Sequence, residues 1–306
     1  MTLPRFELQV TARDSIAGIG LMLAGIALFS LNDALGKWLL VTYSVGQLLL
    51  IRSIAALLLL VPFLWTGGVA AIANAPRPAL QALRVVLSTV EVAMFFWAIS
   101  YLPLADTVTF YLAGPIYVTA LSVLLLGETV GWRRWSAVLV GFAGVLLALR
   151  PSAASLTLPA SIALAGSVFY ALLMIATRLL HETPNTLLVG GQIFGTLIFG
   201  LVVAPFAWVA PSLADLALLS LFGVVSIVAL ACVNRALKIA AASVLAPYQY
   251  TFIVWAIALG YLVFGDMPDR FTVCGAAIII LAGLYILWRE RRRKRPAEAT
   301  VAAQFE

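Results

Sequence analysis

The chain has 306 residues, of which 63% are hydrophobic and only 10% are charged, and its mean hydropathy is +1.08. About a quarter of the residues in a soluble domain are charged, so this composition excludes a large extramembrane enzyme. The net charge of +6 does not indicate nucleic-acid binding, because six of the 19 Lys and Arg lie at 289–295, beside the last apolar segment. A basic run in that place is typical of contact with anionic lipid.

Segments of about 20 apolar residues follow one another along the chain, and each is long enough to cross a bilayer as a helix. The connections between them are short. We count ten such segments, at 16–40, 44–65, 79–101, 105–126, 132–149, 159–180, 186–207, 214–236, 241–264 and 270–288. The predicted fold class is therefore an all-α integral membrane protein with ten transmembrane helices.

Basic residues are divided unequally between the two ends of these segments. With the N-terminus in the cytoplasm, 15 of the 19 Lys and Arg fall on the inner side, and four fall on the outer side. Cytoplasmic loops carry such an excess of Lys and Arg in membrane proteins. We therefore expect both termini of this multi-pass protein to be cytoplasmic, with residues 291–306 as a basic cytoplasmic tail. The membrane that we predict is the bacterial inner membrane.

The chain contains an internal repeat. Leu126-Gly127-Glu128 closes the fourth segment, and Phe264-Gly265-Asp266 closes the ninth segment 138 residues later. Residues 16–150 and 159–290 are therefore predicted to be two copies of a five-helix unit. Because five is an odd number, the second copy is inverted in the membrane relative to the first. Inverted repeats are typical of secondary transporters, whose substrate site lies between the two halves.

Several short motifs of the first copy resemble those of a known family. They are Pro115 with Leu126-Gly127-Glu128, then Trp135 and Gly141 to Gly144, then Arg150-Pro151. Over nearly its whole length the chain resembles the drug/metabolite transporter superfamily of the EamA type. The resemblance implies ten helices with cytoplasmic ends, and the export of amino acids and related metabolites or the import of vitamins and nucleotide-like compounds.

The second copy departs from this pattern, because it has Asp266 at the position of Glu128 and no proline at the position of Pro115. Within the superfamily, one subgroup includes importers of riboflavin and S-adenosylmethionine. The arrangement that resembles this subgroup consists of Asp33, Lys37, Leu39 and Arg52.

Charged side chains interrupt the first two segments. Asp33 lies about 10 Å and Arg52 about 12 Å below the outer ends of neighbouring segments that a tight loop joins. Charges are expensive in hydrocarbon and persist where they face a partner or a wet cavity. We therefore predict that Asp33 and Arg52 pair at a substrate site that also includes Lys37. The alternative is a pair that only docks the two helices.

The third segment carries Arg84 and Glu91, which lie two helical turns apart on one face. Arg84 is close to the inner end, from which a long side chain can reach the membrane surface, so we expect a topology anchor. Glu91 lies about 15 Å deep, near the middle of the hydrocarbon core. We predict that Glu91 couples transport to protons, and the alternative is a structural acid that never changes its protonation.

The middle of the second copy offers aromatic and amide side chains in place of charges. With Asn32 and Tyr111 of the first copy, the further predicted substrate-binding residues are Tyr170, Gln192, Asn234, Tyr248, Gln249 and Trp255. A charged wall facing such a wall suits a substrate with one ionic end and one flat or apolar end.

The charges of the first wall predict the substrate class. Lys37, Arg52 and Arg84 against Asp33 and Glu91 leave one net positive charge. We therefore predict an anionic or zwitterionic metabolite, most simply an amino acid or a derivative. A vitamin or nucleotide-like compound of the riboflavin or S-adenosylmethionine type is the alternative.

Two prolines are predicted to break membrane helices. Pro115 in the fourth segment and Pro247 in the ninth each remove a backbone donor. Breaks in matching helices point to the binding site of many transporters, although simple kinks are an alternative. Glu128 and Asp266 each follow a glycine and precede the next predicted helix, which we expect them to cap.

Three glycines of the seventh segment permit close helix contact of the small-xxx-small kind. They are Gly191, Gly195 and Gly200. We expect this contact inside the chain, and a homodimer interface is the alternative.

The sequence as a whole predicts a secondary active transporter, whose partners are the bilayer and a small molecule. It has one His, His181, and no motif of a metal site, nucleophile elbow or phosphate loop. Neither a metal nor a cofactor is therefore expected, and an intramembrane enzyme is the less favoured class. Without a nucleotide-binding motif, the energy must come from an ion gradient, from exchange or from the gradient of the substrate itself.

Overall fold

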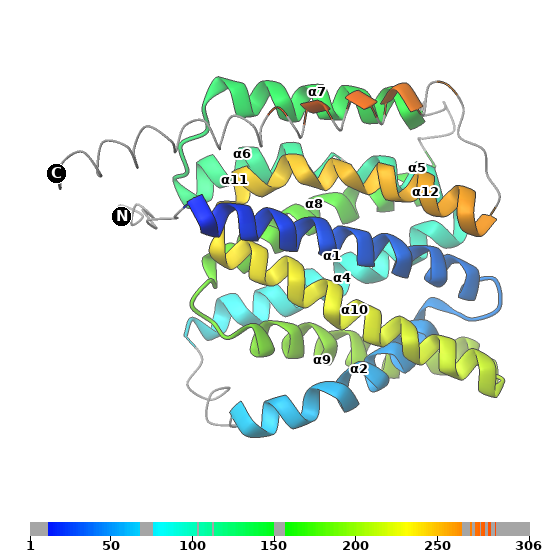
Figure 1. Cartoon of the computed structure of the whole chain (residues 1–306). Helices are drawn as coiled ribbons and strands as arrows, with labels where there is room; N and C mark the ends of the chain where they lie inside the picture. Colours follow the sequence, from blue (N-terminus) through cyan, green and yellow to red (C-terminus); the bar gives the residue numbers. More distant parts are fainter. Residues whose placement is uncertain are drawn as a thin grey trace.

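The described structure is a set of long helices that run side by side (Figure 1). It is a computed structural model that describes residues 12–67, 76–102, 104–111, 113–149 and 157–264, with 270, 273–275, 277–278, 281–282 and 285. Its helical elements before residue 265 are α1 (Ala12–Leu39), α2 (Val45–Gly67), α4 (Pro78–Tyr101), α5 (Leu104–Tyr111), α6 (Gly114–Leu126), α7 (Trp132–Leu149), α8 (Leu158–Leu179), α9 (Asn185–Val203), η2 (Ala204–Ala207), α10 (Leu213–Ile239), α11 (Ala242–Leu245), η3 (Ala246–Thr251) and α12 (Phe252–Phe264).

Five of these helical stretches are long and apolar enough to cross a membrane. They are Asp14–Leu39, Pro78–Tyr101, Leu158–Leu179, Asn185–Ala207 and Leu213–Ile239. Shorter apolar helices cover parts of four further predicted segments, at Val45–Val61, Ile116–Leu126, Trp135–Gly144 and Tyr248–Val263. Most of the last predicted segment, 270–288, lies outside the described residues. The chain is a multi-pass helical membrane protein, and the total of ten spans stays a prediction.

Both predicted helix breaks coincide with interruptions of the backbone helix. In the first half, α5 ends at Tyr111 and α6 begins at Gly114, with Pro115 in its first turn. In the second half, Pro247 lies in the first turn of the 3₁₀ helix η3, which separates α11 from α12. A proline is tolerated in a first turn because its missing N–H would have no helical acceptor there.

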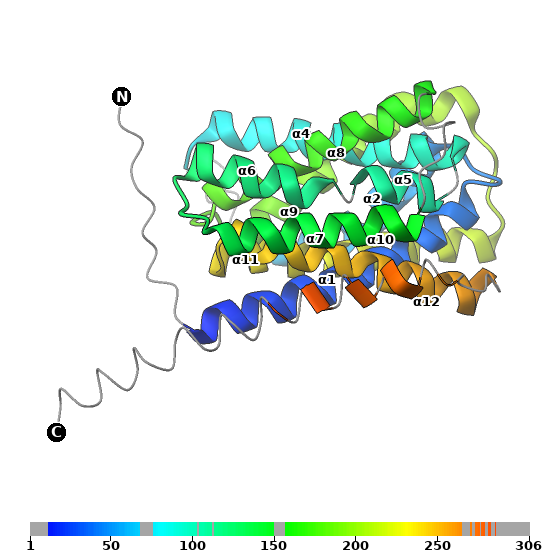
Figure 2. The same ribbon diagram turned by 90° about the horizontal axis from the view of Figure 1, so that it is seen from above.

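Helices of the two halves pack against one another in pairs. α1 lies against α10, α2 against α9 and α4 against α8, and the views along two directions agree on the first of these pairs (Figures 1 and 2). α10 also contacts α2, and α9 contacts α4. The interior of the bundle is therefore bounded by helices from both halves.

Two apolar clusters fill the ends of the bundle. One gathers around Met22, Met174 and Leu237, where α1, α8 and α10 meet. The other gathers around Leu48, Phe96 and Phe222, where α2, α4 and α10 meet. Met174 and Leu237 of the first cluster and Phe96 of the second also line the cavity described below.

The glycines of α9 allow it to approach two neighbouring helices closely. A Cβ atom on Gly195 would lie 2.7 Å from a Val85 side-chain carbon on α4, and one on Gly200 would lie 2.7 Å from the backbone of Leu50 on α2. Gly191 also faces Val85. The prediction of close contact inside the chain is therefore confirmed for these glycines.

Glu128 caps the start of α11 in the second half, whereas the sequence predicted that it caps the helix that follows it in the chain. Its Oε1 accepts a hydrogen bond from Ala242 N, at the start of α11, at 3.2 Å. The same oxygen lies 3.8 Å from Arg178 Nε. The left-handed turn at Gly127 (φ 65°) ends α6, and the next helix, α7, begins at Trp132. Asp266 lies outside the described residues.

Candidate functional site

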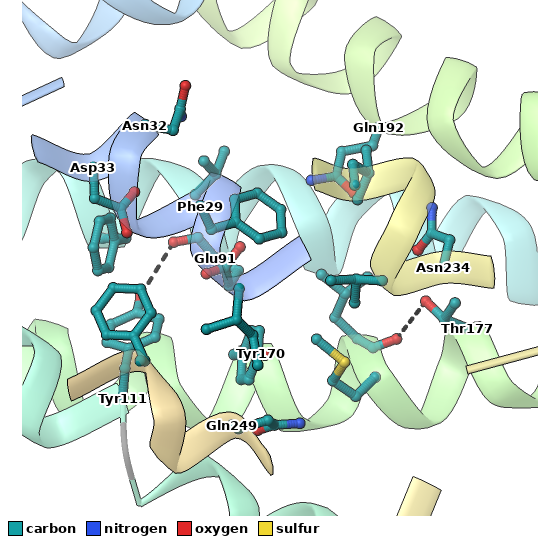
Figure 3. Close-up of a pocket in the computed structure, with 18 of the residues that line it drawn as sticks. Phe29, Asn32, Asp33, Glu91, Tyr111, Tyr170, Thr177, Gln192, Asn234 and Gln249 are labelled. Atoms are coloured by element: carbon teal, nitrogen blue, oxygen red, sulfur yellow. Dashed lines mark hydrogen bonds between the residues drawn. The ribbon is translucent and has the colours of Figure 1, made fainter. Parts of the chain in front are cut away.

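A cavity lies in the interior of the bundle, between helices of both halves (Figure 3). Its described walls are mostly apolar and aromatic side chains with a small number of polar and charged groups, which is the usual make-up of a small-molecule site. The predicted substrate-binding residues that line it are Asn32, Asp33, Arg52, Glu91, Tyr111, Tyr170, Gln192, Asn234 and Gln249.

Three ionisable side chains line one part of the cavity. Asp33 and Arg52 are buried, and Glu91 is half-buried. Arg52 interacts electrostatically with both carboxyl groups. The ion pairs within 4 Å among the described side chains do not include Asp33 with Arg52. Arg52 is therefore a shared counter-charge for two acids across the cavity, and the predicted direct pair with Asp33 is not a contact of this structure.

Two aromatic rings hold the Arg52 guanidinium in place. Its Cζ atom lies 5.8 Å from the centre of the Phe96 ring and 5.3 Å from the centre of the Phe222 ring. Both distances suit a cation–π interaction. Gly36 leaves room for the two rings, because a Cβ atom there would lie 2.7 Å from Phe96 and 2.9 Å from Phe222.

Tyr111 and Tyr170 form an aromatic part of the wall beside Glu91. The Tyr111 hydroxyl donates a hydrogen bond to the backbone carbonyl of Glu91 at 3.3 Å (Figure 3). A Cβ atom on Gly166 would overlap that hydroxyl, so glycine is required there for this ring position. Because α5 ends at Tyr111, the break before Pro115 places this residue at the cavity.

The structure corrects the interpretation of Arg84. Its side chain is only 1% exposed and does not reach the membrane surface. Its guanidinium donates hydrogen bonds to Thr177 Oγ1 at 2.8 Å, to the Leu188 carbonyl at 2.8 Å and to Asn234 Oδ1 at 2.9 Å. These acceptors belong to α8, α9 and α10, so Arg84 joins three helices of the second half to α4. Depth along the helix suggested an anchor, but the direction of the side chain around the helix axis decides the role.

Three predicted site residues do not line the cavity. Trp255 is 40% exposed on the outside of the bundle, and Tyr248 is buried in the cluster around Met22. Lys37 is also outside the lining. Without Lys37 and Arg84, the described part of the lining carries two acids and one base, so the predicted excess of positive charge does not hold among these residues.

The other described lining residues, most of them apolar, were not predicted, and Phe29 and Thr177 are two examples. Phe29 lies four residues before Asp33 on α1, and this spacing could have placed both on one face. Thr177 gave no such signal, because a threonine in any helix can satisfy its hydroxyl on a carbonyl of the preceding turn, as Thr177 does on Leu173 at 2.8 Å. Among the described side chains, no group of three or more His, Cys, Asp or Glu residues is placed to hold a metal ion.

Comparison with known proteins identifies the family. The sequence profile of the EamA-like transporter family matches residues 16–150 and, a second time, residues 157–288. The chain belongs to the EamA-like transporter family. The two matches together include the described residues that line the cavity.

Relatives within the EamA-like family carry different substrates. The S-adenosylmethionine uptake transporter of Rickettsia prowazekii (strain Madrid E) is 28% identical over 277 residues, which cover 90% of this chain and 94% of the relative. The riboflavin transporter of Vibrio cholerae serotype O1 is 27% identical over 281 residues, with the same coverage. The pseudopaline exporter CntI of Pseudomonas aeruginosa (PAO1) is 29% identical over 270 residues, covering 86% of this chain and 94% of the exporter.

A solved crystal structure has the same fold as this EamA-like chain. The two superpose with a TM-score of 0.77 at 16% sequence identity. The match covers 91% of this chain and 99% of that one. At this identity the likeness describes the fold alone.

Proposed function

We propose that this EamA-like protein is a secondary active transporter that moves a small zwitterionic metabolite, an amino acid or a derivative, by alternating access. The cavity carries this proposal, because it lies between the two halves and combines an ionic part with an aromatic and amide part. Relatives named for uptake of S-adenosylmethionine, transport of riboflavin and export of pseudopaline support an organic metabolite as the substrate.

The arrangement of the helices supports alternating access. The contact of α1 with α10 has a counterpart in the contact of α8 with α4, and the contact of α10 with α2 has one in that of α4 with α9. These pairs are those expected if residues 16–150 and 159–290 are inverted copies related by a pseudo-two-fold axis. Rocking of one copy against the other around a fixed central site is a common transport mechanism.

The charges that line the cavity support a zwitterion over an anion. Asp33 and Glu91 can receive a substrate ammonium group, and Arg52 can bind a carboxylate, for which its planar guanidinium is well suited. A purely anionic substrate would meet two acids and one base. The anionic class is therefore less favoured than the residue count in the sequence alone suggested.

Counterflow in liposomes tests the function directly. Proteoliposomes loaded with a mixed panel of amino acids, S-adenosylmethionine and riboflavin should accumulate the matching labelled compound, because exchange needs no external energy source. An intramembrane enzyme would convert a compound without exchange, and a sensor or assembly protein would give neither signal. Absence of counterflow for the whole panel would contradict the proposal.

The proposed topology has both termini in the cytoplasm of a bacterial cell, with the protein in the inner membrane. The 15-to-four distribution of Lys and Arg supports it. A reporter that is active only in the cytoplasm should be active when it is fused after Trp288, and a reporter that is active only in the periplasm should be inactive there. A periplasmic signal would contradict this orientation and, with it, the inverted relation of the two copies.

Glu91 is proposed to couple transport to protons. Glu91→Gln keeps the shape and hydrogen bonding of the side chain but cannot titrate. We expect the variant to retain counterflow exchange and to lose its response to an imposed pH gradient. Glu128→Gln is the matched control, because it makes the same change in an acid outside the cavity, and it should keep the response. A wild-type protein that ignores the pH gradient would exclude this role for Glu91.

A further inference from the structure

Among the described residues, four amide side chains line the cavity with buried polar atoms that have no hydrogen-bond partner, namely Asn32 on α1 and the three residues Gln192, Asn234 and Gln249. Gln192, Asn234 and Gln249 are only 7%, 2% and 4% exposed and come from α9, α10 and η3. In the described part of the chain, no hydrogen-bond partner reaches Gln192 Oε1, Asn234 Nδ2 or either amide atom of Gln249. Leaving a buried polar group unsatisfied is costly and rare. Several such atoms around one cavity point to a polar ligand.

The orientation of the Asn234 amide is fixed by Arg84. Arg84 Nη2 donates to Asn234 Oδ1 at 2.9 Å, and a guanidinium has donors only. The oxygen of the amide must therefore face Arg84, and its NH₂ group must face away from it. Arg84 is itself held by Thr177 and by the Leu188 carbonyl. Asn234 thus presents a donor of defined direction to an acceptor on the ligand.

The ring of Tyr170 adjoins one of these amides, Gln249. A Cβ atom on Gly114 would lie 3.1 Å from the Tyr170 ring and 3.9 Å from Gln249 Oε1. The ring and the amide are therefore neighbours. The close-up shows Gln192, Asn234 and Thr177 on one side of the cavity and Asp33 on the other (Figure 3). A flat ligand could stack on the Tyr170 ring while its edge meets the amides.

We propose that Asn234, Gln249 and Gln192 form a subsite for a planar nitrogen heterocycle that carries a ring acceptor and an N–H donor. Asn234 donates to the ring nitrogen or carbonyl, and the Gln side chains, which have both donors and acceptors, complete the edge. The ionic end of the same molecule lies at Asp33, Arg52 and Glu91. This inference rests on the proposed function, since it takes the cavity to be the site of the transported metabolite.

The sharpest test is Asn234→Asp. The carboxylate keeps an acceptor for Arg84 and strengthens that hydrogen bond, so the folded state is retained, but the donor becomes an acceptor. Binding to the full-length protein in detergent is measured with adenosine, riboflavin and 1-, 3- and 7-deazaadenosine. In the wild type, adenosine or riboflavin binds, and Asn234→Asp weakens that binding at least about tenfold, the value of one hydrogen bond. Asn185→Asp makes the same change away from the cavity lining and should bind as the wild type does.

The deaza compounds locate the acceptor when adenosine is the ligand. One of them lacks the ring nitrogen that accepts the hydrogen bond from Asn234, and it should bind the wild type about tenfold more weakly than adenosine does. This difference should disappear in Asn234→Asp, because the variant has no NH₂ group to donate that hydrogen bond. If riboflavin alone binds, the flavin ring is the heterocycle, and the loss in Asn234→Asp is the supporting result. Wild-type protein that binds neither ring, or an Asn234→Asp variant that binds both normally, overturns the subsite.

Gln249→Met provides a second variant. It removes two buried amide atoms without partners while keeping a similar volume, so the melting temperature without ligand should stay unchanged or rise, and heterocycle binding should weaken at least about tenfold. A fall in melting temperature with normal binding would assign Gln249 a structural role and count against the subsite. Because binding requires no flux, failure of counterflow alone would contradict only the proposed function. Binding of ringless zwitterions alone would contradict only the subsite.

Discussion

Gly223→Ala is expected to destabilise the protein and to abolish transport. Gly223 on α10 packs directly on the backbone of Arg52 on α2, where a Cβ atom would overlap the Arg52 carbonyl oxygen and lie 3.0 Å from its carbon. Backbone atoms cannot rotate away as a side chain can, so the two helices must separate. Overpacking of this kind costs about 1–3 kcal/mol. It also displaces the guanidinium of Arg52, which lines the cavity.

Gly20→Ala is the matched control for this prediction. Gly20 lies in the interior of α1, and a Cβ atom there would meet nothing within 4 Å. Alanine in place of a helical glycine normally stabilises by about 0.5–1 kcal/mol, so this variant should be as stable as the wild type or more so. Thermal unfolding in detergent and counterflow compare the two. Equal melting temperatures and equal transport would show that α2 and α10 are not in the contact described.

Arg52→Met is expected to reduce transport by about a hundredfold or more and to lower stability. Arg52 is the counter-charge of both Asp33 and Glu91, and methionine leaves two carboxyl groups without it. Removing one partner of a buried charge network costs about 3–5 kcal/mol. The Phe96 and Phe222 rings would also lose the cation that lies over them.

A second substitution separates the structural effect from the functional one. Adding Asp33→Asn to Arg52→Met removes one of the uncompensated charges, so we expect stability to recover while transport stays lost, because the group that binds the substrate carboxylate is still absent. Arg133→Met, at an exposed cation near the start of α7, controls for the change itself and should leave both properties unchanged. Recovery of transport in the double variant would assign Arg52 a purely structural role.

The ionic part of the candidate site could be predicted because a charge within an apolar segment has few interpretations. Asp33, Arg52 and Glu91 stand out from the sequence for that reason, and all three line the cavity. Thr177 and Phe29 could not stand out in the same way, since an apolar or weakly polar residue in a membrane helix fits equally well against lipid, against a neighbouring helix or around a ligand.

The sequence by itself determined that this is a multi-pass helical membrane protein of the EamA type, because apolar segments of sufficient length and the motifs around Glu128 are properties of the linear chain. The tertiary structure decided which side chains meet. The sequence predicted Arg84 to be a surface anchor and Trp255 to bind substrate, and neither prediction agrees with the structure. The depth of a residue in the membrane follows from its position along a helix, whereas the direction of its side chain depends on the rotation of the helix about its axis. Membrane helices are apolar on all sides, so the sequence carries little signal for that rotation. Only packing of α4 against α8 and α9 turned Arg84 inward, onto Thr177, Leu188 and Asn234.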